Sequence, residues 1–157
     1  MSVLLKWFQT EVHGWKWCTF LLLSVSVAFT LATLDASLFA LADIEPSSVY
    51  TVDQSVYPAA VALYHIPTSA LLEELEFRVP LFVVGLLSIR LVPLAFLASV
   101  IVFGCVHGDI TNILLQGVVG LVLGVVFLKC GGLQKKPFKA LASSTVVHAL
   151  YNGLIWI

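Results

Sequence analysis

The chain alternates between long apolar stretches and short polar segments. Five such stretches cover about residues 17–42, 59–87, 91–107, 110–128 and 140–157. A helix needs about 20 apolar residues to cross the hydrocarbon core of a bilayer, and only the third stretch is clearly shorter than that. The pattern therefore predicts an all-α fold, a polytopic transmembrane helical bundle with about five membrane-spanning helices.

Composition supports the same fold class. Hydrophobic residues make up 60% of the 157 residues and charged residues 11%, against about 25% charged residues in soluble domains. A soluble fold of this size cannot bury so much apolar surface, so lipid must cover it. We expect a single integral membrane domain over residues 1–157 whose first partner is membrane lipid. The formal net charge of -1 gives no reason to expect a nucleic-acid partner.

The basic residues predict the orientation in the membrane. If the five stretches cross in alternation, seven of the eight basic residues fall on one side, namely Lys6, Lys16, Arg90, Lys129, Lys135, Lys136 and Lys139. The first loop instead contains Asp43, Glu45 and Asp53 without Lys or Arg. The positive-inside rule then places the N-terminus in the cytoplasm and the C-terminus outside. We expect an integral protein of a prokaryotic cytoplasmic membrane.

The second stretch contains charges that a bilayer does not tolerate well. They are Glu73, Glu74, Glu76 and Arg78. Each charge near the bilayer centre costs about 2.5–3.5 kcal/mol, so this helix must face protein or a wet cavity. Such clusters usually mark a functional site, although a network that only joins helices is the alternative.

Helical spacing predicts how these charges pair. Glu74 and Arg78 are four residues apart with the acid first, which is the favourable order for an ion pair on a helix. Glu73 is rotated about 100° from Glu74, so its carboxylate is free to act as a base. Elsewhere, His107 ends the third stretch, and His148 and Asn152 project from one face of the fifth.

These residues form three motifs in a fixed order. Glu73-Glu74-x-x-x-Arg78, Phe103-x-x-x-His107 and His148-x-x-x-Asn152 together resemble the signature of the CAAX-protease and bacteriocin-processing (CPBP) family of glutamic intramembrane peptidases. The resemblance covers residues 59–157, which would form the peptidase-like core, and this chain is shorter than better-known members of the family.

The resemblance implies an endopeptidase that cuts a membrane-associated peptide or protein and needs no cofactor. Glu73, helped by His107, would activate water, and His148 and Asn152 would donate hydrogen bonds to the oxyanion. Glu74 and Arg78 would stabilise the helix and set the local electrostatic field. Prenylated CAAX tails, peptide pheromones, bacteriocin leaders and sorting signals all fit such a pocket.

Three alternatives remain at this point. A zinc peptidase could use Glu73, His107 and His148 as ligands and leave a fourth position for water. A non-catalytic binding or immunity protein could capture a peptide or lipid headgroup in the same polar pocket. A small transporter could relay protons along Glu and His residues, although the sequence shows no inverted repeat.

Overall fold

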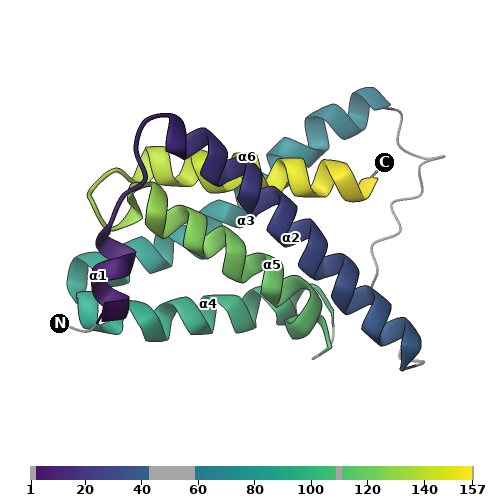
Figure 1. The fold of residues 1–157 in the computed structure, drawn as a ribbon, viewed down its shortest axis with the longest axis horizontal. Helices are drawn as coiled ribbons and strands as arrows, with labels where there is room; N and C mark the ends of the chain where they lie inside the picture. Colours follow the sequence, from purple (N-terminus) through teal and green to yellow (C-terminus); the bar gives the residue numbers. More distant parts are fainter. Residues whose placement is uncertain (1–2, 43–58, 109–110, 157) are drawn as a thin grey trace.

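The computed structural model describes residues 3–42, 59–108 and 111–156 of the chain. These residues form helices with short connections and no strand. The elements, labelled in Figure 1, are α1 (Val3–Gln9), α2 (Trp15–Leu41), α3 (Ala59–Leu87), the 3₁₀ turn η1 (Ile89–Leu91), α4 (Val92–Val106), α5 (Asn112–Phe127), the π turn η2 (Leu128–Gly132) and α6 (Pro137–Trp156). Each apolar stretch contains one long helix, so the prediction of an all-α helical bundle is confirmed.

Length and composition identify three helical segments in the described part of the chain that can cross a membrane. They are Trp15–Leu41, Ile89–Val106 and Asn112–Gly132. The third stretch, too short by itself, reaches 18 residues because η1 continues into α4. Helix α3 is 29 residues long but carries the four charged residues. The protein is therefore a polytopic helical bundle, and the crossing number of five stays a prediction.

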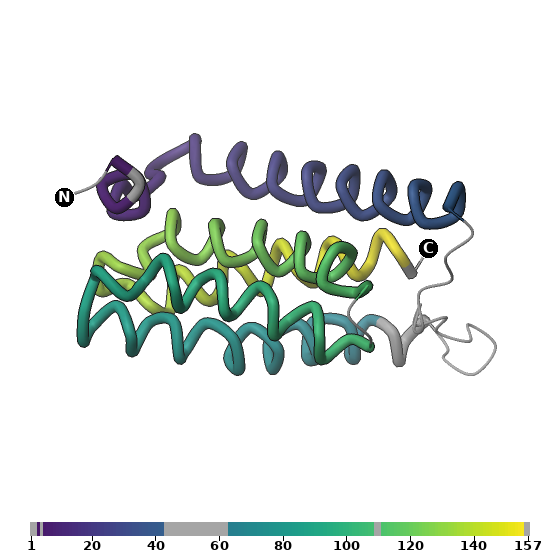
Figure 2. Tube along the Cα trace, turned by 90° about the horizontal axis from the view of Figure 1, so that it is seen from below, coloured from purple at the N-terminus to yellow at the C-terminus, as the bar shows by residue number. Residues whose placement is uncertain are grey.

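The long helices lie roughly side by side. Helix α2 runs along one side of the bundle, α5 and α6 lie in the middle, and α3 and α4 lie on the other side (Figure 2). Contacts agree with this order, since α2 packs against α5 and α6 whereas α3 packs against α6 and α4. The middle helix α5 is accordingly the most buried of the candidate spans.

Glycines allow α4 and α5 to approach closely. A Cβ atom added to Gly120 would lie 2.9 Å from the ring of Phe103, and one added to Gly124 would overlap the ring of Phe96. Both aromatic residues belong to α4, so the two glycines provide the space that its side chains fill. Small residues at this spacing have the same use in other membrane helices.

The N-terminal segment closes one end of the bundle. The ring of Phe8 is 4% exposed and packs on Phe96 with ring centroids 5.7 Å apart. Lys129 Nζ donates hydrogen bonds to the carbonyl of Trp7 at 2.9 Å and to Thr10 Oγ1. Lys129 directly follows the fourth apolar stretch, where the sequence predicts the start of a loop, but the structure places it in η2 and buries it. The predicted acidic loop with Asp43, Glu45 and Asp53 lies outside the described residues.

Glu11 connects this segment to the start of α6. Its carboxylate oxygens lie 2.8 Å from Lys136 Nζ and 2.6 Å from Lys139 Nζ. Burial opposes ionisation of Glu11, but the two ammonium groups outweigh it and lower the pKa to about 2. We call Glu11, Lys136 and Lys139 the terminal ion cluster.

Candidate active site

Helix α3 brings the first motif to the middle of the bundle. It continues through Pro67 and Pro80, residues that remove helical hydrogen bonds but are tolerated in membrane helices. Its buried side faces α6 and α4, which carry the other two motifs. The three motifs therefore meet because α3 packs against both helices that hold the other two.

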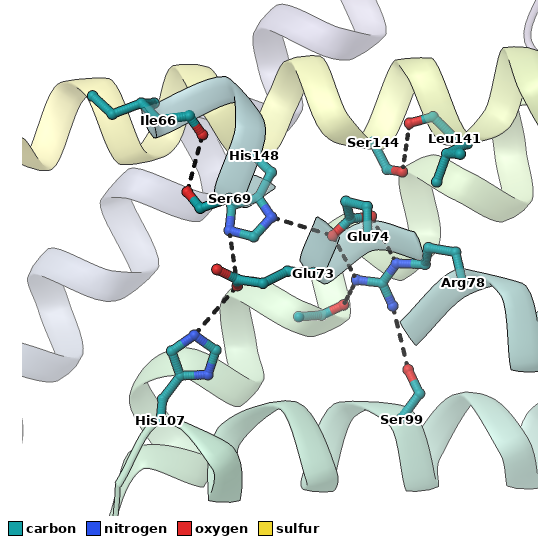
Figure 3. A network of polar contacts seen from close by, with 11 residues as sticks. Ile66, Ser69, Glu73, Glu74, Arg78, Ser99, His107, Leu141, Ser144 and His148 are labelled. Atoms are coloured by element: carbon teal, nitrogen blue, oxygen red, sulfur yellow. Dashed lines mark hydrogen bonds and ion pairs between the residues drawn. The ribbon is translucent and has the colours of Figure 1, made fainter. Parts of the chain in front are cut away.

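The predicted ion pair between Glu74 and Arg78 is present. Arg78 Nε donates to Glu74 Oε2 at 2.8 Å and Nη2 donates to Oε1 at 3.3 Å. Both side chains are 0% exposed. The guanidinium also donates to the carbonyl of Gly120 and to Ser99 Oγ, each at 3.3 Å (Figure 3). Sequence reasoning missed these last two acceptors, because no local pattern marks a residue on another helix as a partner.

Glu73 faces two histidines from different helices. Its Oε2 lies 3.4 Å from His107 Nε2 and 3.6 Å from His148 Nε2, as Figure 3 shows. The Glu73 side chain is 29% exposed and that of His107 17%, whereas that of His148 is 3% exposed. In the part of the chain that the structure describes, no hydrogen bond reaches the buried Oε2. The carboxylate is thus held near two imidazoles and remains accessible from one side.

The second nitrogen of each imidazole faces an oxygen atom, although only the contact of His107 has the geometry of a hydrogen bond among the described residues. His107 Nδ1 lies 2.6 Å from the carbonyl of Phe103, and His148 Nδ1 lies 3.3 Å from Glu74 Oε1. Carbonyl and carboxylate oxygens only accept hydrogen bonds, so both contacts favour a proton on Nδ1. Consequently the Nε2 atoms of both rings point toward Glu73.

Phe103 explains the spacing of the second motif. Besides its carbonyl contact, its ring lies 4.6 Å from the ring of His107 and 5.9 Å from that of His148, between centroids. The Phe103 side chain is 0% exposed. Phe103 lies one helical turn before His107, and its ring therefore packs against both imidazoles and helps to position them.

Asn152 lies one turn after His148 on α6, but it is not part of this network. It is partly exposed, and its side chain makes no hydrogen bond within residues 3–42, 59–108 and 111–156. Glu76, the remaining charge of α3, is exposed and also lies outside the network. A buried polar residue that sequence reasoning missed is Asn112, whose Nδ2 has no hydrogen-bond partner among the described residues. A lone Asn after a polar turn gives no signal in the sequence.

The metal ligands suggested by the sequence are near one another. However, the described residues contain no group of three His, Cys, Asp or Glu side chains arranged to hold a metal ion. Glu73, His107 and His148 are therefore close without forming such a group.

Comparison with protein families covers all three motifs. The model for type II CAAX prenyl endopeptidase Rce1-like proteins matches residues 55–154, which is more than half of the chain. The chain belongs to the Rce1-like family. The predicted family resemblance is thereby confirmed, and with it a general assignment as a membrane peptidase of the CAAX-protease type. No curated protein and no solved structure matched the chain.

Proposed function

We propose that this protein is an intramembrane endopeptidase in which Glu73 activates the attacking water. The observation that carries the proposal is the position of the Glu73 carboxylate, 3.4 and 3.6 Å from two imidazole Nε2 atoms and partly exposed. A general base must be within hydrogen-bond reach of the water that attacks the substrate. Glu74, the next residue, is sealed in an ion pair and cannot do this.

In the proposed reaction Glu73 removes a proton from water as the oxygen attacks the scissile carbonyl. In this step His107 carries a proton on both nitrogens, and its Nε2–H, 3.4 Å from Glu73 Oε2, holds the carboxylate in position and stabilises its negative charge. The proton then passes to the leaving amine as the carbon–nitrogen bond breaks, so Glu73 returns to its starting state. Phe103 supports this step through its carbonyl contact with His107 Nδ1.

His148 and Asn152 are proposed as donors to the oxyanion. For His148 this needs a ring protonated on both nitrogens, with Nδ1–H toward Glu74 and Nε2–H toward the substrate. Glu74 Oε1 lies 3.3 Å from Nδ1, on the opposite side of the ring from Nε2. Asn152 has no internal side-chain partner among the described residues, so its amide is available to a substrate. Removing one oxyanion donor typically costs a factor of about 10²–10³ in turnover.

The proposed substrate is a membrane-associated peptide or protein, of the CAAX type, a leader, a pheromone or a sorting signal. The proposal includes an orientation with the N-terminus in the cytoplasm of a prokaryotic cell. A cysteine placed at Ser47 or Asp53 should then react with an impermeant thiol reagent from outside, and one at Lys135 should not. Labelling of Lys135→Cys in intact cells would contradict this orientation.

The proposed mechanism uses no metal. Activity should survive exhaustive chelation, and purified protein should contain no stoichiometric zinc. About one zinc per chain, lost together with activity and restored by added zinc, would instead support Glu73, His107 and His148 as ligands.

The deciding experiment compares purified wild-type protein and Glu73→Gln on a cleavable peptide in lipid vesicles. Glutamine keeps the size of the side chain and removes its basicity, so the variant should fold and lose a factor of about 10²–10⁴ or more in rate. Equal cleavage by both proteins would refute the role of Glu73. Cleavage by neither, with peptide still bound, would favour a binding or immunity protein.

A further inference from the structure

Glu76 lies on the uncovered side of α3. That side also carries exposed residues before and after it, including Ser69, Leu72, Val79 and Val83. Helix α3 packs against α6 and α4, and it lies at the edge of the bundle opposite α2 (Figure 2). The Glu76 carboxylate therefore points away from the bundle toward whatever surrounds α3.

The depth of Glu76 makes this exposure unfavourable. Leu87, the last residue of α3, follows it by 11 residues, a rise of about 16 Å. The hydrocarbon core is about 30 Å thick, so Glu76 lies near its middle if α3 ends at an interface. A carboxylate facing lipid there is strongly disfavoured. Within the described residues neither a hydrogen bond nor an ion pair reaches this carboxylate, so its position suits a polar partner that approaches the open side of α3.

Pro80 adds a second acceptor at the same place. Proline has no N–H, so the carbonyl four residues earlier loses its usual helical donor. Pro80 lies inside α3 and is exposed, and the carbonyl in question belongs to Glu76. Among the described residues, Glu76 thus has a carboxylate without a partner and a carbonyl without its usual helical donor on the open side of α3. Together they suit a group that carries several N–H donors and a positive charge, as Lys and Arg do.

The proposed catalytic carboxylate is next to this position. Glu73 precedes Glu76 by three residues, which puts their Cβ atoms about 5–6 Å apart on one side of a helix. Glu73 is itself 29% exposed. An extended peptide advances about 3.3–3.6 Å per residue. If the cleaved peptide bond of the substrate lies beside Glu73, a substrate side chain that reaches Glu76 therefore belongs to a residue within about two positions of that bond.

We propose that Glu76 selects substrates with lysine or arginine within about two residues of the cleaved bond. This inference rests on the proposed peptidase function and adds the substrate class. A second copy of the chain is a poor occupant of this face, because it would bring another Glu76 toward the first. A cationic substrate residue instead neutralises the carboxylate at the depth where its charge is least tolerated.

The test uses a peptide library in phosphatidylcholine vesicles, randomised at three positions on either side of a central bond. Cleaved products are read by mass spectrometry for wild type, Glu76→Gln, Glu76→Lys and the control Val83→Gln. Val83 is exposed two turns further along the same side of α3, so its variant adds an amide there without touching Glu76. The amount of folded protein is measured for each variant.

Wild type and Val83→Gln should enrich Lys or Arg about tenfold at one position within two residues of the cut. Glu76→Gln should lose this enrichment, and Glu76→Lys should replace it with Asp or Glu. Cleavage by wild type without a preference for basic residues would overturn this inference and leave the peptidase function standing. The same preference in folded Glu76→Gln would also overturn it, and cleavage of no library member would overturn both proposals.

Discussion

Glu73 and Glu74 are consecutive residues of α3, yet they belong to two different regions of the molecule. Glu74 is 0% exposed, and Arg78 donates to both of its oxygens. Glu73 is 29% exposed and faces two imidazoles at distances longer than a typical hydrogen bond. A rotation of about 100° along the helix separates a closed ion pair from an open polar cluster.

The difference indicates how α3 can carry so many charges. Arg78 also donates to Gly120 and Ser99, so the closed region connects α3 to α5 and α4 and leaves few polar groups unpaired. The open region leaves Glu73 Oε2 without a hydrogen bond among the described residues, which a substrate or water can supply. We infer that the first region stabilises the bundle and the second performs chemistry.

His148 contacts both regions and therefore offers the most direct way to separate them. Its Nε2 faces Glu73 and its Nδ1 faces Glu74. His148→Asn places an amide near the Nδ1 position and lacks Nε2, so it should lose a factor of about 10²–10³ in turnover. Its thermal stability should exceed that of His148→Ala, which keeps neither contact. Turnover and melting temperature are measured on the same preparations, and an active His148→Asn would show that Nε2 has no catalytic part.

Arg78 tests the closed region. Removing one partner of a buried ion pair costs about 3–5 kcal/mol, because the other charge is left unpaired. Arg78→Ala should therefore lower the yield of folded protein and the midpoint of denaturation. The double variant Glu74→Leu/Arg78→Met, with both charges replaced, should be more stable than Arg78→Ala. Normal stability of Arg78→Ala would contradict a structural role for the pair.

Gly104 tests how the packing of α4 and α5 positions the open region. Gly104 lies three residues before His107 in sequence. A Cβ atom at Gly104 would overlap the backbone of Ile113. Gly104→Ala should cost about 1–3 kcal/mol through overpacking and lower activity by displacing His107. Gly153→Ala is the matched control, since its Cβ meets nothing within 4 Å. Comparable losses of stability and activity in both variants would mean that the close approach of α4 and α5 at Gly104 does not position His107.

The smallest expected effect concerns the terminal ion cluster, far from both regions. The pKa of Glu11 falls from 4.5 to about 2 on folding, so its contribution to stability is complete above pH 4.5 and disappears as the pH falls toward 2. The lysines are partly exposed, so we expect about 1 kcal/mol at most. Melting temperatures of wild type and Glu11→Gln should differ at pH 6 and converge on acidification. A difference that grows in acid would contradict this assignment.

The sequence by itself determined the helices and one of the site's pairs. Apolar length predicted α2 to α6, since lipid requires long helices with satisfied backbone groups. The Glu74–Arg78 pair followed from a spacing of four residues, because helix geometry alone brings such residues together. Helix α1 was missed because seven residues are too few to give a periodic signal.

The tertiary structure decided which residues from different helices meet. Spacing within α3 and α6 cannot tell that His148 lies between Glu73 and Glu74, or that Gly120 and Ser99 accept hydrogen bonds from Arg78. The spacing of residues in the sequence also did not reveal that Asn152 stays outside the network or that Glu76 faces outward. Those facts depend on the rotation and depth at which each helix packs, and close packing with its neighbours sets both.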